Sequence, residues 1–139
     1  MKDSGPILLV DDNRDDAFML TYALKHAGIP NPVEFVHDGE QAIKYLKGEG
    51  AYADRIRFPI PELVLLDLQM PCVTGFEFLE WLRREPGLRH LPVIVLATIN
   101  SAEDVLRAYQ LGANAFLGKT GNQFVRDCLR GFRRAIARS

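Results

Sequence analysis

The sequence predicts an α/β fold in which a parallel sheet is covered by helices on both faces. Two observations favour this fold class. Short apolar runs alternate along the chain with longer segments whose apolar residues recur with the period of a helix. The apolar runs contain almost no polar residue, which is typical of strands that are covered on both sides. Five strands that alternate with five helices make a doubly wound domain.

The five expected strands are rich in Val, Ile and Leu. Each run is too short to be a buried helix, and each is followed by polar or turn-forming residues. The runs are Ile7–Val10, Val33–Val36, Leu63–Leu66, Val93–Leu96 and Ala115–Leu117.

Each expected strand is followed by a segment in which apolar residues are spaced three and four apart. This spacing places them on one face of a helix, where they can pack on the sheet. The apolar positions of the five helices are Leu20, Ala23, Leu24 and Ala27; Ala42, Tyr45 and Leu46; Phe78, Trp81 and Leu82; Ala102, Val105, Leu106 and Tyr109; and Val125, Cys128, Leu129, Phe132 and Ile136.

Local signals mark where several helices begin and end. Three pairs of residues resemble capping boxes, in which side chains satisfy the free N–H groups of the first turn. They are Asp38 with Gln41, Thr74 with Glu77, and Ser101 with Asp104. Gly28, Gly48 and Gly112 suit the left-handed residue that ends a helix. The stretch 48–61 contains glycines and prolines and predicts a longer connection before the third strand.

Composition and charge set further bounds. The chain has 139 residues, which suits one domain spanning 1–139 with no effector domain. Hydrophobic residues make up 47% and the net charge is -1, so the sequence favours a globular cytoplasmic protein without a bias toward nucleic acid or membrane. Two cysteines, Cys72 and Cys128, are too few for a disulfide framework. No signal peptide and no apolar segment of about 20 residues is present.

Charged residues follow three of the expected strands. Asp11 and Asp12 follow the first, Asp67 follows the third, and the fifth leads through Gly118 to Lys119. Because the carboxyl ends of parallel strands open on one edge of the sheet, we expect these side chains to converge there. Three carboxylates at close quarters repel one another and need a cation or a proton. An oxygen-only set of ligands favours Mg²⁺.

Single residues of this set have ordinary explanations. Asp11 or Asp12 alone would more often cap a helix, and Lys119 alone would more often be a surface lysine. Asp67 is harder to explain in this way, since a carboxylate at the end of a buried strand is costly unless it is paired or bound to metal. The set as a whole therefore favours a functional site.

The motifs resemble those of the receiver domain of two-component response regulators. The resemblance rests on Val10-Asp11-Asp12-Asn13, Leu66-Asp67-Leu68-Gln69-Met70-Pro71 with Gly75, and Gly112-Ala113-Asn114 followed by Lys119. It covers nearly the whole chain and implies a flavodoxin-like fold with strand order 2-1-3-4-5. Three further segments look like those of small regulators that pair with phytochrome-type sensor kinases. They are Gly50–Asp54, Leu88–Pro92 and Ala108–Gly112.

The resemblance implies a role for each charged residue. Asp67 would be the phosphoacceptor that takes a phosphoryl group from a sensor histidine kinase or a phosphotransfer protein. Asp12, Asp67 and the backbone carbonyl of Gln69 would hold Mg²⁺, with Asp11 binding directly or through water. Lys119 would pair with a phosphoryl oxygen.

Two positions depart from the family pattern. Ala97 stands where receivers have a Thr or Ser that bonds the phosphoryl group, and strand alternation points the next residue, Thr98, elsewhere. Thr120 replaces the proline that usually follows the lysine, whereas Phe116 retains the aromatic switch residue. These departures bear on switching more than on phosphorylation.

We expect a signalling domain whose output is protein contact, with no enzymatic activity beyond self-assisted phosphotransfer and slow self-dephosphorylation. One alternative is a pseudo-receiver that is never phosphorylated, which Ala97 and Thr120 favour and the intact acidic residues oppose. A Mg²⁺-dependent phosphatase would need a second Asp where Gln69 stands. A flavin-binding module is less favoured, because the first strand leads into acidic residues rather than hydroxyl-rich ones.

The sequence also bears on partners. Glu103 and Asp104 on the fourth helix could pair with Arg126 and Arg130 on the fifth, so we expect a homodimer through the fourth helix, fifth strand and fifth helix. Direct binding to nucleic acid or to a membrane is not expected.

Overall fold

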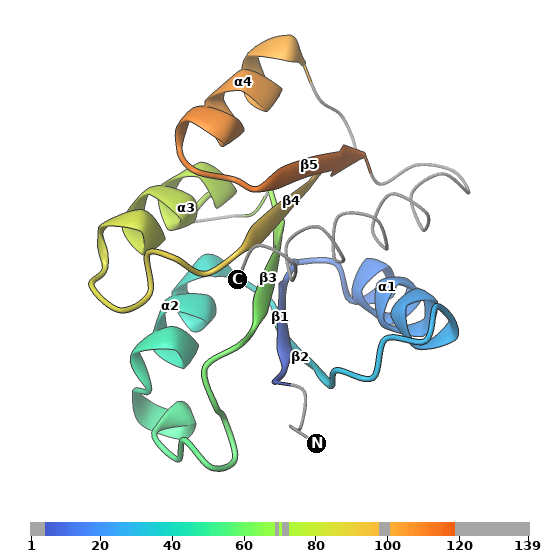
Figure 1. The fold of residues 1–139 in the computed structure, drawn as a ribbon, viewed down its shortest axis with the longest axis vertical. Coiled ribbons are helices and arrows are strands. Elements are labelled where there is room, and N and C mark those ends of the chain that lie inside the picture. The colour runs from blue at the N-terminus through green and yellow to red at the C-terminus, as the bar shows by residue number, and fades with distance from the viewer. Residues whose placement is uncertain (1–4, 69, 71–72, 98–100, 119–139) are drawn as a thin grey trace.

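The computed structural model describes residues 5–68, 70, 73–97 and 101–118 (Figure 1). Its five strands are β1 (Ile7–Val10), β2 (Val33–Val36), β3 (Leu63–Asp67), β4 (Val93–Ala97) and β5 (Ala115–Gly118). They form one parallel sheet in the order β2-β1-β3-β4-β5. The expected fold class and strand order are therefore confirmed.

Four helices and one turn of 3-10 helix connect these strands within the described ranges. They are α1 (Arg14–His26), α2 (Gly39–Lys47), η1 (Gly50–Tyr52), α3 (Gly75–Arg84) and α4 (Ala102–Gln110). Figure 1 shows α1 on one face of the sheet and α2 and α3 on the other. The expected fifth helix falls in 119–139, outside the described residues. None of the helices in the described ranges has the length and apolar character needed to span a membrane.

Strand alternation divides the core into two layers. In β1 and β3, the side chains of Leu8, Val10 and Leu66 lie in the cluster that contains the buried residues of α2 and α3. Their neighbours Leu9 and Leu65 lie in a second cluster with the buried residues of α1. A strand with both faces covered must be apolar at every position, and each fully buried Leu or Val contributes about 1.5–3 kcal/mol. This two-sided burial explains why β1, β3 and β4, which are buried at every position, appeared in the sequence as apolar runs.

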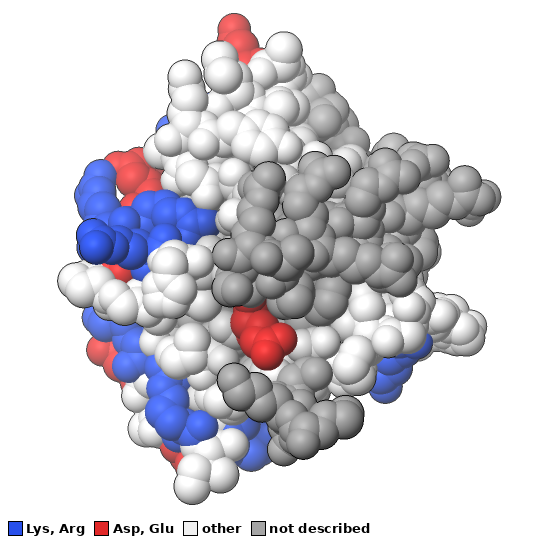
Figure 2. Space-filling view, viewed as in Figure 1, with Lys and Arg blue, Asp and Glu red and all other residues white. Residues whose placement is uncertain are grey.

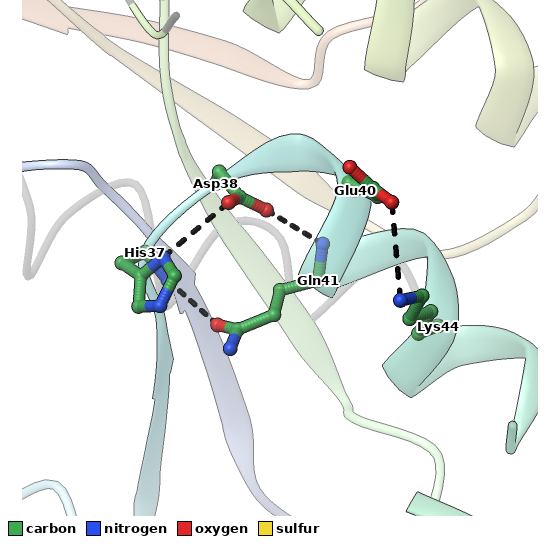
Figure 3. A network of polar contacts seen from close by, with 5 residues as sticks. All are labelled: His37, Asp38, Glu40, Gln41 and Lys44. Carbon is green, nitrogen blue, oxygen red and sulfur yellow. Dashed lines mark hydrogen bonds and ion pairs between the residues drawn. The ribbon is translucent and has the colours of Figure 1, made fainter. Parts of the chain in front are cut away.

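The three expected caps are present at the helix starts, but they differ in form. Thr74 and Glu77 form a reciprocal capping box, whereas Ser101 caps α4 through the single bond that its Oγ accepts from the N–H of Asp104. Asp38 accepts the N–H of Gln41, at 2.7 Å. The Gln41 side chain does not complete a box, however. Its Oε1 accepts the N–H of His37, the residue before Asp38, instead of the N–H of Asp38 (Figure 3).

The expected apolar stripe of the fourth helix is partly wrong. Leu106 and Tyr109 are 59% and 48% exposed, and the buried residue of α4 is Ala108. The small Ala108 side chain packs in the cluster beneath α3 and α4, so the helix contacts the sheet through a different face. The exposed residues lie on the surface through which a homodimer was expected. That dimer stays a prediction, because the fifth helix lies outside the described residues.

The connection at 48–61 is more ordered than its sequence predicts. The rings of Tyr45, Tyr52 and Phe58 contact one another, with centroids 5.1 to 5.9 Å apart. The guanidinium of Arg55 donates to the carbonyls of Tyr45 and Phe58, and Tyr45 donates its hydroxyl to the Pro59 carbonyl. Burial of the hydroxyl raises the pKa of Tyr45 to about 12. These contacts fix the path of the chain from α2 into β3.

A second arginine ties α3 to two connections. The Arg83 guanidinium donates to the carbonyls of Gly112, Arg89 and Leu91 and to Oδ1 of Asn114, at 2.7 to 3.2 Å. Burial lowers its pKa. Arg83 thereby joins α3, the approach to β4 and the approach to β5.

Candidate functional site

Three carboxylates meet at the carboxyl edge of the sheet, as the sequence predicts. Val10 of β1 pairs with Leu66 of β3, so the residues that follow them, Asp11 and Asp67, lie side by side. Asp12 comes next in the chain. One oxygen atom from each of the three carboxylates lies within 4.8 Å of the other two.

The three carboxylates differ in exposure. Asp11 is 1% exposed and Asp67 is 4% exposed, whereas Asp12 is exposed to solvent. Three negative charges this close repel strongly when two of them are shielded from water. A cation that approaches from the side of Asp12 can relieve this repulsion.

The turn from β1 into α1 orients Asp11. Its Oδ1 accepts the backbone N–H of Asn13 at 2.9 Å. Asn13 in turn is the N-cap of α1, and its side chain accepts the N–H groups of Asp15 and Asp16. The start of the helix therefore holds Asp11 in place beside Asp67, and Asp12 lies at the junction between strand and helix.

Asp67 is held by both of its neighbouring elements. It lies opposite Leu96 in the ladder between β3 and β4, and the N–H of the next residue, Leu68, donates to the Leu96 carbonyl. The Leu68 carbonyl accepts the N–H of Gly75, the first residue of α3. The backbone at Asp67 is thus fixed between β4 and α3.

These ligands suit a hard divalent cation. All the donor atoms are carboxylate oxygens, which Mg²⁺ prefers, and one carboxylate is open to solvent, where Mg²⁺ can keep water ligands. Among the described residues, the donor set contains no thiolate or imidazole that would favour a softer metal. The residues present therefore fit Mg²⁺.

Three expected site residues lie outside the described residues: Gln69, Thr98 and Lys119. Their roles stay predictions. Ala97 is fully buried at the end of β4, and Phe116 in β5 is half-buried and packs on the cluster that contains Ala97. The expected switch positions that the structure describes are therefore close in the fold.

A second polar group lies after β2, where the sequence predicted the Asp38 cap but not the pairing of His37 with Asp38. Figure 3 shows the ring of His37 facing Asp38, with Nδ1 and Oδ2 3.4 Å apart, and Lys44 beside Glu40 on α2. Val36 pairs with Val10, so His37 follows β2 at the same level as Asp11 follows β1. The carboxyl ends of parallel strands open on one edge of the sheet, and this reasoning, applied to β2, would have pointed to His37.

Lys and Arg side chains gather along the side of α2 and α3 on the face shown in Figure 2, with Asp and Glu side chains among them. Two ion pairs join residues four apart on one helix: Lys44 with Glu40 on α2, and Arg84 with Glu80 on α3. Mixed charge of this kind is typical of solvated helix faces.

Comparison with known proteins gives consistent matches over most of the chain. Residues 7–125 match the response regulator receiver domain family. Response regulator Rcp1 of Synechocystis sp. is 35% identical over 116 residues, which cover 84% of this chain and 77% of Rcp1. The probable methanogenesis regulatory protein FilR2 of Methanothrix harundinacea is 39% identical over 114 residues, which cover 81% of this chain and 70% of FilR2.

Solved structures give the same result. The phosphorylated cyanobacterial phytochrome response regulator RcpA superimposes with a TM-score of 0.86 at 32% identity, covering 99% of this chain and 97% of RcpA. The bacteriophytochrome response regulator AtBRR has a TM-score of 0.83 at 34% identity, covering 96% and 94%. The Mn²⁺-bound form of Rcp1 has a TM-score of 0.80 at 31% identity, covering 94% and 92%.

Proposed function

The chain belongs to the response regulator receiver domain family of two-component systems, and we propose that Asp67 accepts a phosphoryl group from a sensor histidine kinase. The observation that carries this proposal is the convergence of Asp67 with Asp11 and Asp12 within 4.8 Å. Receiver domains are signalling domains rather than classical enzymes, so the output we propose is a change in protein contacts.

Asp67 is better placed than its neighbours to act as the nucleophile. Asp11 is oriented toward the start of α1 by its contact with the Asn13 N–H, and Asp12 is exposed to solvent, whereas Asp67 is 4% exposed. Asp67 ends a central strand with its backbone fixed on both sides, which restricts where its carboxylate can lie. Restricting a nucleophile to the reacting geometry lowers the entropic part of the barrier.

The proposed step transfers one phosphoryl group. A carboxylate oxygen of Asp67 attacks phosphorus, the bond from phosphorus to the histidine nitrogen breaks, and an aspartyl phosphate forms. Asp12, Asp67 and the backbone carbonyl of Gln69 would hold Mg²⁺, with Asp11 binding directly or through water, and the ion would supply positive charge near the transferred oxygens. We propose that Lys119 pairs with one of these oxygens.

The relatives support one class of kinase. RcpA and AtBRR are phytochrome response regulators, and we propose a phytochrome-type sensor kinase as the phosphodonor for this chain. We also propose that this receiver domain acts in the cytoplasm and without direct contact to nucleic acid.

We expect one mass increment, equal to one phosphoryl group, when the protein is mixed with acetyl phosphate and Mg²⁺. The carboxylate cluster supplies both the nucleophile and the metal ligands, so EDTA should suppress the reaction. Intact-mass spectrometry measures the increment, and a parallel sample with EDTA is the control. Labelling that proceeds equally well in EDTA would contradict the proposed metal site.

Ala97 keeps the pseudo-receiver as a second candidate. A receiver that lacks the hydroxyl at the end of β4 loses one donor to the phosphoryl group, and a hydrogen bond to a charged group contributes about 1.5–3 kcal/mol. Absence of any label on the wild-type protein, from acetyl phosphate or from a kinase, would favour this candidate.

We expect Ala97→Thr to strengthen the response of Phe116 to phosphorylation. Ala97 belongs to the cluster against which Phe116 packs. A hydroxyl at position 97 that moves toward the phosphoryl group should therefore change the packing around the Phe116 ring. NMR shift changes of Phe116 on addition of beryllofluoride measure the response in wild type and variant. Equal, large changes in both proteins would show that another group already makes this contact.

A further inference from the structure

The first residues of two helices lie against residues that follow β3 in the chain. Gly75 is the first residue of α3, and Gly39 is the first residue of α2. Both glycines are buried, and both lie against backbone atoms of the segment that begins at Asp67.

Glycine is needed at position 39 because a side chain would not fit there, and not because of its backbone conformation. Its φ is not among the positive values that favour glycine. A Cβ at this position would lie 2.9 Å from Cβ and Cγ1 of Val73 and 3.0 Å from the Val73 carbonyl oxygen. Rotating the Val73 side chain can relieve only the contact with Cγ1. An added methyl group must therefore displace the backbone of Val73 or the start of α2.

The start of α2 is the less movable of the two partners. Asp38 caps the helix through the N–H of Gln41. The inner face of the helix is buried by Ala42, Tyr45 and Leu46, which are fully or almost fully covered. Because interiors are close-packed, shifting this helix would disturb many contacts at once. The displacement should therefore fall on Val73.

Displacement of Val73 reaches Asp67 through a short path. Two residues further along the chain, the Gly75 N–H donates to the Leu68 carbonyl, at 3.2 Å. Gly75 also lies so close to Asp67 that a Cβ there would be 2.7 Å from the Asp67 carbonyl oxygen. Among the described residues, close approaches thus link Gly39 to Val73 and Gly75 to Asp67, and Val73 and Gly75 are two residues apart in the chain.

We propose that Gly39 is a positioning residue for phosphoryl transfer. Because glycine has no side chain, the start of α2 can pack closely against Val73, and this contact helps to determine the position of Asp67. The inference rests on the proposed role of Asp67 as phosphoacceptor and metal ligand. Active-site groups must hold within about 0.5 Å of their reacting geometry, and small misplacements cost rate. Gly39 acts through Val73 and touches neither metal nor phosphodonor.

The test compares Gly39→Ala with wild type and with Gly87→Ala. Gly87 has a positive φ and nothing within 4 Å of an added Cβ, so its substitution strains the backbone far from the acidic residues. Calorimetry with Mg²⁺ alone gives metal affinity, and intact mass with acetyl phosphate at saturating Mg²⁺ gives the labelling rate. We expect Gly39→Ala to weaken both by about tenfold, and Gly87→Ala to change only thermal stability.

A compensating variant separates positioning from general destabilisation. Val73→Gly removes the two side-chain atoms that a Cβ at position 39 would meet, so it should restore most of the metal affinity and labelling rate when combined with Gly39→Ala. This double variant also carries the test if the single variant does not fold. Wild-type affinity and rate in Gly39→Ala, or a double variant that stays as impaired as the single one, would overturn the inference. Failure of the wild-type protein to bind Mg²⁺ or take a label would instead overturn the proposed function.

Discussion

Replacing Asp67 with Asn is expected to abolish labelling by acetyl phosphate and by a kinase, a loss of about 10³-fold or more. An amide cannot attack phosphorus to form the acyl phosphate, and the buried end of β3 offers no other carboxylate in the same place. Asp11→Asn and Asp12→Asn should weaken Mg²⁺ binding and slow the reaction while leaving the nucleophile intact.

The matched control for this prediction is Asp15→Asn. Asp15 is an exposed carboxylate in the first turn of α1, and its backbone N–H, which Asn13 accepts, is unchanged by the substitution. We expect Asp15→Asn to label at the wild-type rate in the mass experiment. A phosphoryl group that persists on Asp67→Asn would mean that a different residue is the acceptor.

Replacing Arg83 with Met is expected to lower the free energy of unfolding by about 3 kcal/mol. Met keeps most of the length of the aliphatic part of the arginine side chain, but it lacks the N–H groups that donate to the carbonyls of Gly112, Arg89 and Leu91. Leaving a buried acceptor without its donor costs about 1–3 kcal/mol, and the losses within one network are not additive. Urea denaturation, read from the shift in midpoint at constant slope, measures the change.

Arg84→Met provides a control on the neighbouring residue of the same helix. Arg84 is exposed and pairs with Glu80 four residues earlier, an arrangement that contributes about 0.3–0.5 kcal/mol. Equal losses of stability in the two variants would show that the Arg83 contacts are no stronger than a surface pair.

The strands and the acidic cluster could be predicted because each depends on a simple rule. Two-sided burial makes every position of a strand such as Leu63–Asp67 apolar up to the edge of the sheet, and polar residues resume at that edge. Asp11 and Asp67 are far apart in sequence, but parallel pairing of β1 and β3 brings the ends of the two strands together. The strand ends could therefore be located to within one residue, since β3, β4 and β5 each extend one residue beyond the expected run, to Asp67, Ala97 and Gly118.

The contacts of Arg83 and Arg55 could not be predicted in the same way. Both side chains donate mainly to backbone carbonyls, and every residue type carries a carbonyl. No partner residue stands out in the sequence, so an arginine of this kind looks the same as a solvated one such as Arg84. The space needed at Gly39 is similarly invisible, because it depends on how closely α2 approaches Val73.

The ordered connection between α2 and β3 offers a practical attachment point for a reporter group. Its tip residue, Ile56, is 96% exposed, while its N–H is held by the Asp54 carboxylate and the chain around it is anchored by Arg55. The connection enters β3 at Leu63, the end of the strand opposite Asp67, and the length of that strand separates the two by about 13 Å. A dye joined to a cysteine introduced at position 56 would therefore sit on an anchored segment and report on tumbling or complex formation without crowding the acidic residues.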